Sequence, residues 1–220
     1  MLSTRGKTLL VGGLVAVFAT VLLYRLLRPE TVNTWPITNL PVRDGGILCF
    51  GDSLVAGVGA ETKDRAYPAQ LQDLLRRKVV AVGTLGQTAE EGLKKLQKDP
   101  RLRAPVVIVT LGGNDLMNRV ELEDTLDALR GIFTELQGRR AVVVFTGIDS
   151  PMSSTRGEKY EQLCRETGVI LVPNILKGIF RNEDLKADTV HPNGDGYAIF
   201  AQRVADTLLP YLEVVAKKPR

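Results

Sequence analysis

Four short segments of the sequence carry side chains that could perform nucleophilic chemistry. A serine nucleophile needs a base that takes its proton, and the base needs an acid that orients it. The tetrahedral oxyanion formed by the attack needs N–H donors that converge on it. All of these groups occur in Gly51-Asp52-Ser53-Leu54, Gly83-Thr84-Leu85-Gly86, Gly112-Gly113-Asn114-Asp115 and Asp188-Thr189-Val190-His191. Together, the four segments predict acyl transfer by a serine.

The histidine and cysteine counts restrict the chemistry further. The 220 residues include one histidine, His191, so any mechanism that needs an imidazole must use it. One histidine and two cysteines nearly exclude a Cys/His zinc site, and two cysteines cannot form a disulfide scaffold. Cys49 and Cys164 are therefore expected to be small buried hydrophobes. We expect neither a metal nor a cofactor.

Residues of these types also have structural roles in many proteins. Ser53 could cap a helix. The stretch from Gly51 to Gly59 could bind phosphate in a flavodoxin-like fold, although it lacks the glycine spacings of such loops. Asn114 could be a turn residue that hydrogen-bonds its own backbone, and His191 a satisfied structural histidine.

The glycines and the remaining acids of these segments have alternatives too. Gly83 and Gly86 could be turn residues with positive φ, and a missing Cβ also lets a backbone amide approach a substrate. Asp52 and Asp115 are expected to order loops through backbone hydrogen bonds rather than to act in catalysis.

Continuous apolar runs, which alternate along the chain with amphipathic segments, must position these residues. The runs predict strands buried on both faces at Ile47–Phe50, Val79–Val82, Val106–Leu111, Ala141–Thr146 and Val169–Val172. Helices are predicted at Tyr67–Lys78, Thr88–Lys98, 122–136, Glu158–Thr167 and Asn193–Leu212. This alternation predicts an α/β fold, a three-layer α/β/α sandwich around a five-stranded parallel sheet. Ligands of such sheets bind beyond the carboxyl ends of the strands, where the first three segments lie.

The four segments resemble blocks I, II, III and V of the SGNH hydrolases, also called GDSL esterases/lipases, and the match extends over about residues 46–213. Each block taken alone is weak evidence, but four in the right order are specific. The resemblance implies that Ser53 is the nucleophile and that Asp188 orients His191 as the base. It also implies that the Ser53 amide, Gly86 and Asn114 form the oxyanion hole. Ala81 departs from the family, many members of which have Asn there.

The excess of basic over acidic residues is confined to the N-terminus of the chain. The chain has 29 basic and 25 acidic residues, and residues 1–28 contain four basic residues and no acid. The remaining residues are therefore neutral overall, which argues against nucleic-acid binding.

The same N-terminus contains a long uncharged run. As a helix rising ~1.5 Å per residue, the seventeen residues from Thr8 to Tyr24 would measure roughly 26 Å, close to the thickness of a bilayer core. We expect an uncleaved transmembrane signal anchor at residues 1–28; a cleaved leader and a buried core helix are the alternatives. A proline-rich linker at 29–45 and the hydrolase domain at 46–216 would follow.

The substrate and the location are less determined by the sequence. The resemblance implies a lysophospholipid, short acyl or aryl ester, or alternatively an O-acetyl group on an envelope polysaccharide. A non-catalytic tethered binding protein with the same fold is a further alternative. By analogy with the family, the catalytic domain is expected on the extracytoplasmic side. The loop Ile148–Gly157 is expected to border an acyl pocket, with Met152 beside it and Arg156 meeting an anionic group. The oligomeric state stays open.

Overall fold

A computed structural model describes residues 33–149 and 155–216, with side chains up to residue 212. The expected membrane anchor at 1–28 and Met152 lie outside the described residues. Within the described ranges, no helix combines the length and apolarity needed to cross a membrane.

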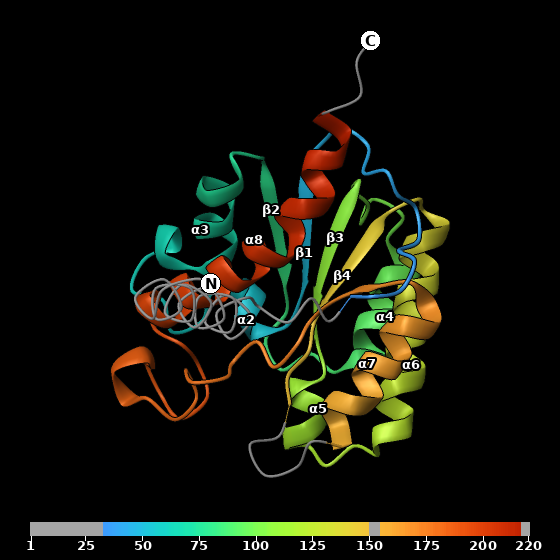
Figure 1. Cartoon of the computed structure of the whole chain (residues 1–220). Helices are drawn as coiled ribbons and strands as arrows, with labels where there is room; N and C mark the ends of the chain where they lie inside the picture. The colour runs from blue at the N-terminus through green and yellow to red at the C-terminus, as the bar shows by residue number, and fades with distance from the viewer. Residues whose placement is uncertain (1–32, 150–154, 217–220) are drawn as a thin grey trace, which may run out of the picture. The chain divides into compact units, whose positions relative to one another are not determined.

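Five parallel strands form one sheet in the order β2-β1-β3-β4-β5 (Figure 1). The strands are β1 (Ile47–Gly51), β2 (Val79–Gly83), β3 (Val106–Thr110), β4 (Val142–Thr146) and β5 (Ile170–Val172). Apolar residues of neighbouring strands lie in register, as Ile47 does with Val106 and Val107 with Val143. The predicted five-stranded parallel sheet is therefore confirmed, with strand ends within one residue of the predicted ones.

Helices cover both faces of the sheet, which confirms the three-layer architecture (Figure 1). The α-helices are α2 (Ser53–Ala56), α3 (Tyr67–Leu75), α4 (Ala89–Lys98), α5 (Gly113–Met117), α6 (Leu122–Gly138), α7 (Thr155–Thr167) and α8 (Gly194–Ala216). Two 3-10 turns, η1 (Lys63–Arg65) and η2 (Glu183–Leu185), lie between them. Helices α3 and α8 pack together on one face, and α4, α6 and α7 pack on the other.

Alternate residues of each central strand point into two separate cores. Ile47 and Cys49 of β1 face the core formed with α3 and α8. Leu48 and Phe50 of the same strand face the core formed with α4, α6 and α7. Because successive side chains of a strand point to opposite faces, a strand between two helical layers must be apolar at every position. This requirement explains the continuous apolar runs in the sequence.

Strand β2 is an exception to the predicted burial on both faces. No residue of β2 is fully buried, and Val80 is 46% exposed. β2 lies at the edge of the sheet and pairs only with β1. An edge strand has a neighbour on one side alone, so the helical layers cover it less completely.

The described part of the predicted linker, residues 33–45, has no helix or strand, but it packs against the hydrolase domain. The Asn33 side chain donates to the Leu171 carbonyl at 3.1 Å and accepts from the Leu171 amide at 2.7 Å. The Trp35 indole donates to the Val169 carbonyl at 2.9 Å, and Trp35 belongs to a core cluster. These bonds satisfy backbone groups at the outer edge of β5, which an edge strand otherwise leaves unpaired.

Candidate active site

The turn after β1 presents Ser53 at the start of a short helix. Asp52 is the N-cap of α2, because its carboxylate accepts the Leu54 amide at 2.9 Å, and Gly57 ends the helix in the left-handed region at φ 77°. The aspartate therefore performs the capping role that was one alternative for Ser53. The serine hydroxyl is left to interact with other groups.

Ser53, His191 and Asp188 form a continuous chain of polar contacts. The Ser53 Oγ lies 3.0 Å from His191 Nε2, and His191 Nδ1 lies 2.8 Å from Asp188 Oδ2. A histidine protonated at Nδ1 donates to the carboxylate and can accept the serine proton at Nε2. The structure thus brings together three residues that the sequence separates by as many as 138 positions.

A small hairpin carries both Asp188 and His191. An antiparallel bridge joins Lys186 to Pro192, and the Ala187 amide donates to the His191 carbonyl at 3.0 Å. Asp188 Oδ1 accepts the amide of His191 at 2.8 Å, so acid and base share one turn as their spacing predicts. These backbone and side-chain hydrogen bonds lower the pKa of Asp188 to about 2. The carboxylate stays ionised at neutral pH, as an orienting acid must.

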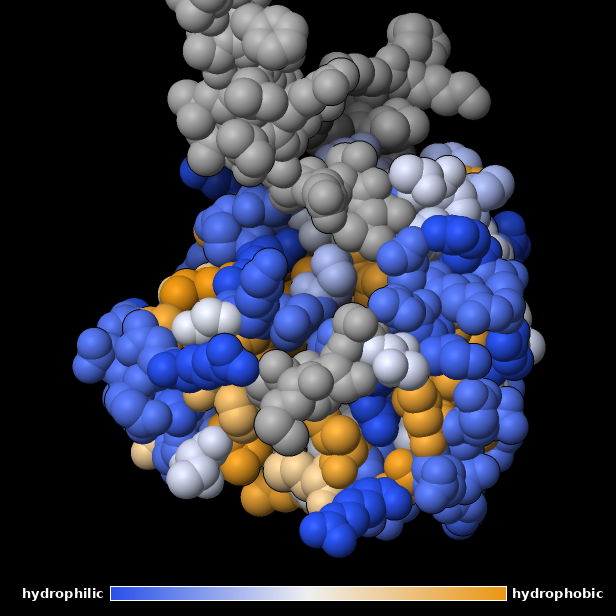
Figure 2. Space-filling model, turned by 60° about the horizontal axis from the view of Figure 1, so that its bottom comes forward, coloured by the Kyte–Doolittle hydropathy of each residue, from blue (hydrophilic) through white to orange (hydrophobic). Residues whose placement is uncertain are grey.

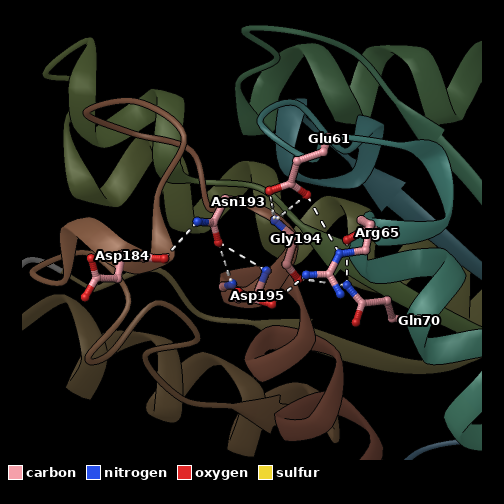
Figure 3. A network of polar contacts seen from close by, with 8 residues as sticks. Glu61, Arg65, Gln70, Asp184, Asn193, Gly194 and Asp195 are labelled. Atoms are coloured by element: carbon pink, nitrogen blue, oxygen red, sulfur yellow. Dashed lines mark hydrogen bonds and ion pairs between the residues drawn. The ribbon is translucent and has the colours of Figure 1, made fainter.

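A network of polar contacts ties this hairpin to the segment that follows the serine helix (Figure 3). Asn193 donates to the Asp184 carbonyl at 2.8 Å and accepts the amides of Asp195 and Gly196 at the start of α8. On the other side, the Glu61 carboxylate accepts the Gly194 amide at 3.2 Å.

The same network continues to α3. Arg65 forms an ion pair with Asp195, and Gln70 donates to the carbonyls of Arg65 and Gly194. The hairpin and the serine segment are therefore held together outside the Ser53–His191 contact itself.

Gly86 lies in a turn that is bonded to both the serine segment and Asn114. The Thr84 amide donates to the Gly51 carbonyl at 2.9 Å, and the Gln87 carbonyl accepts from Asn114 Nδ2 at 3.0 Å. Gly86 has a φ of 73°, which favours glycine. In the described part of the chain, its N–H has no acceptor.

Asn114 lies at the start of α5, next to the serine. Its Nδ2 donates at 3.0 Å to Gln87 and makes a longer contact of 3.4 Å with Asp52 Oδ2. The longer contact is the weaker of the two, and Asn114 also lines the pocket beside Ser53. This N–H can therefore turn to an acceptor in the pocket at little cost.

Asp52 and Asp115 order loops, as the sequence predicts. The Asp115 carboxylate accepts the Ala89 amide at 3.0 Å and so connects α5 to the start of α4. Burial raises the pKa of Asp52 to about 7, although the bond from Leu54 opposes that rise. Burial also raises the pKa of Asp115.

The two cysteines are buried and do not contribute to this site. Cys49 and Cys164 belong to the two cores. Burial raises the pKa of the Cys49 thiol to about 12 and raises that of Cys164 as well. Neither thiol is ionised at neutral pH, so the prediction of small buried hydrophobes is confirmed.

A pocket of about 320 Å³ opens beside Ser53 and Asn114. Its apolar lining residues come from the segments that follow β1, β3, β4 and β5, together with one residue of the histidine hairpin. They are Leu54, Leu116, Met117, Ile148, Leu176, Phe180 and Val190. Figure 2, turned toward the edge at which the strands end, shows hydrophobic residues grouped between hydrophilic ones. Such a lining suits an apolar ligand held next to a few polar groups.

The loop Ile148–Gly157 contributes to the pocket only in part. Ile148 and Asp149 line it, but Arg156 does not. Arg156 is 9% exposed and donates to the Tyr160 hydroxyl at 3.2 Å, so the expectation that it meets an anionic group is wrong. It lies in the first turn of α7, which packs its long side chain inward.

Two cations that the sequence analysis did not single out line the pocket instead. They are Lys177 and Arg181, in the segment that follows β5. Both residues follow the carboxyl end of a predicted parallel strand, which is the feature of the sequence that could have marked them as pocket residues.

Comparison with known proteins gives consistent matches. The model of the GDSL-like Lipase/Acylhydrolase family matches residues 49–199. "Thioesterase 1/protease 1/lysophospholipase L1" of Escherichia coli strain K12 is 30% identical over 178 residues, covering 74% of this chain and 83% of that protein.

Two solved structures are also similar. The crystal structure of TesA has a TM-score of 0.69 at 24% identity, covering 76% of this chain and 99% of that one. The structure of AlinE4, an SGNH-hydrolase family esterase, has a TM-score of 0.60 at 30% identity, covering 81% of this chain and 98% of that one.

Proposed function

The chain belongs to the GDSL-like lipase/acylhydrolase family and is an ester hydrolase of the SGNH type, and from that premise we propose that Ser53, His191 and Asp188 are its catalytic triad. The observation that carries the proposal is the contact chain of 3.0 Å and 2.8 Å from the serine hydroxyl to the aspartate. The open pocket next to Ser53 gives a substrate access to it.

Acyl transfer proceeds in two steps. His191 Nε2 accepts the Ser53 proton while the serine oxygen attacks the ester carbonyl. The tetrahedral intermediate then expels the alcohol, which takes the proton from the imidazolium, and leaves an acyl-serine. Water, deprotonated by the same histidine, releases the acid and restores Ser53. Asp188 holds the imidazole in the required tautomer and stabilises its cationic form.

Three N–H groups stabilise the oxyanion in this mechanism. They are the backbone amides of Ser53 and Gly86 and the side-chain amide of Asn114. In the described residues neither backbone N–H has an acceptor, so both are available to the substrate oxygen. Donors already fixed by the fold cost no reorganisation during the reaction, which makes them effective.

An acyl chain is the substrate group that the pocket fits best. The seven apolar side chains around Ser53 favour an acyl ester, and a lysophospholipid or a short acyl or aryl ester presents one. The name of the Escherichia coli relative includes thioesterase and lysophospholipase. An acetylated polysaccharide has no chain to fill such a pocket, and a binding protein without turnover would not need the Ser53–His191 contact.

We also propose that the N-terminal segment anchors the enzyme in a membrane, with the hydrolase domain on the extracytoplasmic side. The uncharged run from Thr8 to Tyr24 supports the anchor. Alkaline carbonate extraction of membranes should leave the full chain in the pellet, and protease added to spheroplasts should digest the domain. Release by carbonate would contradict the anchor, and protection from the protease would contradict the orientation.

Fluorophosphonate labelling tests the nucleophile. The full chain is expected to take up the probe and to hydrolyse p-nitrophenyl esters, whereas Ser53→Ala and His191→Ala should do neither. Thr134→Ala, which removes an exposed hydroxyl of α6 outside the pocket, is the matched control and should label like the unchanged protein. Circular dichroism should show that all variants are folded. Labelling that survives in Ser53→Ala would overturn the assignment.

A further inference from the structure

One wall of the pocket is a series of tight turns after β5. The amide of Lys177 donates to Asn174 at 2.8 Å, and the amides of Ile179 and Phe180 donate to Leu176 at 3.0 and 3.1 Å. These bonds reach three and four residues back, and Gly178 has a left-handed φ of 77°, so the segment is a series of turns rather than a helix.

The wall carries two kinds of side chain. Leu176 and Phe180 are apolar, whereas Lys177 and Arg181 are cationic. All four line the pocket. The wall therefore presents an apolar surface and a positive charge side by side to the same ligand.

The wall is fixed to the rest of the domain. The Ile175 amide donates to the Gly147 carbonyl at 2.9 Å, just beyond the end of β4. Arg203 of α8 donates to the carbonyls of Ile175 and Lys177, both at 2.6 Å. Because the backbone of the wall is held in this way, only its side chains have to be ordered when a ligand binds, which lowers the cost of binding.

Both cations that line the pocket lie in this wall. The carboxylates that line it, those of the buried Asp52 and of Asp149, lie in the segments that follow β1 and β4. Lys177 is exposed and forms no ion pair within the described part of the chain, whereas Lys186 nearby is paired with Glu183 at 2.8 Å. Lys177 thus keeps its ammonium group for a ligand.

We propose that Lys177 and Arg181 bind an anionic group of the substrate, so that the preferred substrates are monoacyl esters carrying a phosphate or a carboxylate. The inference rests on the proposed function of the same site. An ammonium group attracts an anion as a point charge, and a guanidinium group adds a planar pair of donors. The apolar pair Leu176 and Phe180 contacts the acyl chain while the cations hold the charged end.

Three esters with the same acyl chain test the charge preference of the full-length protein. They are monodecanoylglycerol, the same molecule with a phosphate on its free terminal hydroxyl, and decanoyl glycerate, which carries a carboxylate. We expect kcat/KM to be roughly tenfold higher for at least one charged ester than for the neutral one, as for a charge-assisted hydrogen bond. Comparison of the two charged esters identifies the preferred anion. The preference should decrease as salt is added, because these cations are at the surface.

Charge reversal tests the residues. Lys177→Glu and Arg181→Glu should each lower kcat/KM on the charged ester by about tenfold or more relative to the neutral ester, and so remove the preference. Lys177→Arg should retain it. Lys98→Glu is the matched control, because Lys98 is exposed at the end of α4, in the connection that leads to the start of β3, whereas the pocket lies where the strands end. It changes the net charge equally and should have no effect.

The outcomes separate this inference from the proposed function. If Lys177→Glu keeps the preference, or if the unchanged protein hydrolyses all three esters equally, the anion site is wrong while ester hydrolysis stands. If the unchanged protein hydrolyses none of the three, nor a p-nitrophenyl ester, the proposed function itself fails.

Discussion

At the scale of single residues, Asp52 and Ser53 have different roles at the start of α2. Both residue types cap helices well, and only one of them can do so at a given helix start. Asp52 accepts the Leu54 amide, so the Ser53 hydroxyl is available to His191. Burial of the Asp52 carboxyl disfavours its charged form and raises its pKa to about 7.

Asn114→Ala should lower kcat by roughly 10²–10³-fold and leave KM almost unchanged. The loss of one oxyanion donor costs ~2.7–4 kcal/mol in the transition state, whereas the ground-state ester makes little use of that donor. Steady-state kinetics on a p-nitrophenyl ester measure both constants. An unchanged kcat would remove Asn114 from the oxyanion hole.

Asp52→Asn should flatten part of the pH dependence of stability. Because the pKa of Asp52 is raised from 3.8 to about 7 on folding, the folded protein holds a proton there that the unfolded chain has lost. Its contribution to the free energy of unfolding is complete below pH 3.8 and is lost as pH rises through 7. Asp115 and His191 act on the same carboxyl and remain in the variant.

Urea unfolding at two pH values checks this. From about pH 5 to about pH 8, the unchanged protein should lose on the order of 2 kcal/mol relative to Asp52→Asn. Parallel pH profiles for the two proteins would show that Asp52 is not the group concerned.

At the scale of elements, the start of α8 fixes the histidine hairpin. Asn193 has two roles (Figure 3). Its side-chain oxygen caps α8 by accepting the amides of Asp195 and Gly196, and its side-chain nitrogen donates to the Asp184 carbonyl. A helix start that holds a catalytic hairpin links local stability to activity. The two roles can be separated, because an aspartate keeps the acceptor and loses the donor.

Asn193→Ala should lower the free energy of unfolding by about 1 kcal/mol through the lost cap and should also lower kcat. Asn193→Asp should keep the stability and still lower kcat, with KM little changed in both variants. Thermal unfolding and steady-state kinetics measure the two effects. Full activity in Asn193→Asp would mean that the bond to Asp184 does not position His191.

At the scale of the whole molecule, residues 33–45 belong to the hydrolase domain. Residues 33–38 occupy the open edge of β5 and place Trp35 in a core cluster. Among the described residues no such segment bonds to the opposite edge, at β2, and β2 is correspondingly exposed. A truncation that begins at residue 40 would therefore remove part of the core.

Trp35→Ala should lower the free energy of unfolding by about 3–5 kcal/mol, as for other large core residues. Trp35→Phe keeps most of the ring packing, loses the bond to the Val169 carbonyl and should cost about 1 kcal/mol beyond any loss of packing. Denaturant unfolding of the two variants beside the unchanged chain gives both values. A negligible effect of Trp35→Ala would show that this segment is only loosely attached.

The sequence alone was sufficient for the features that local pattern controls. Continuous apolar runs predicted the parallel sheet, because strands covered on both faces must be apolar throughout. The four segments, in their order along the chain, indicated the family and with it the pairing of Asp188 with His191.

Only the tertiary structure decided the features that depend on distant neighbours. Whether the Ser53 hydroxyl has a base beside it depends on His191, 138 residues away. The exposure of β2 depends on its place at the sheet edge, and the inward position of Arg156 depends on Tyr160 in the packed layer of α7. The cations of the pocket wall also needed the fold, because turns from separate strands meet there only after the sheet is assembled. Burial and contact are properties of the packed chain, so a pattern read along the sequence could not assign them.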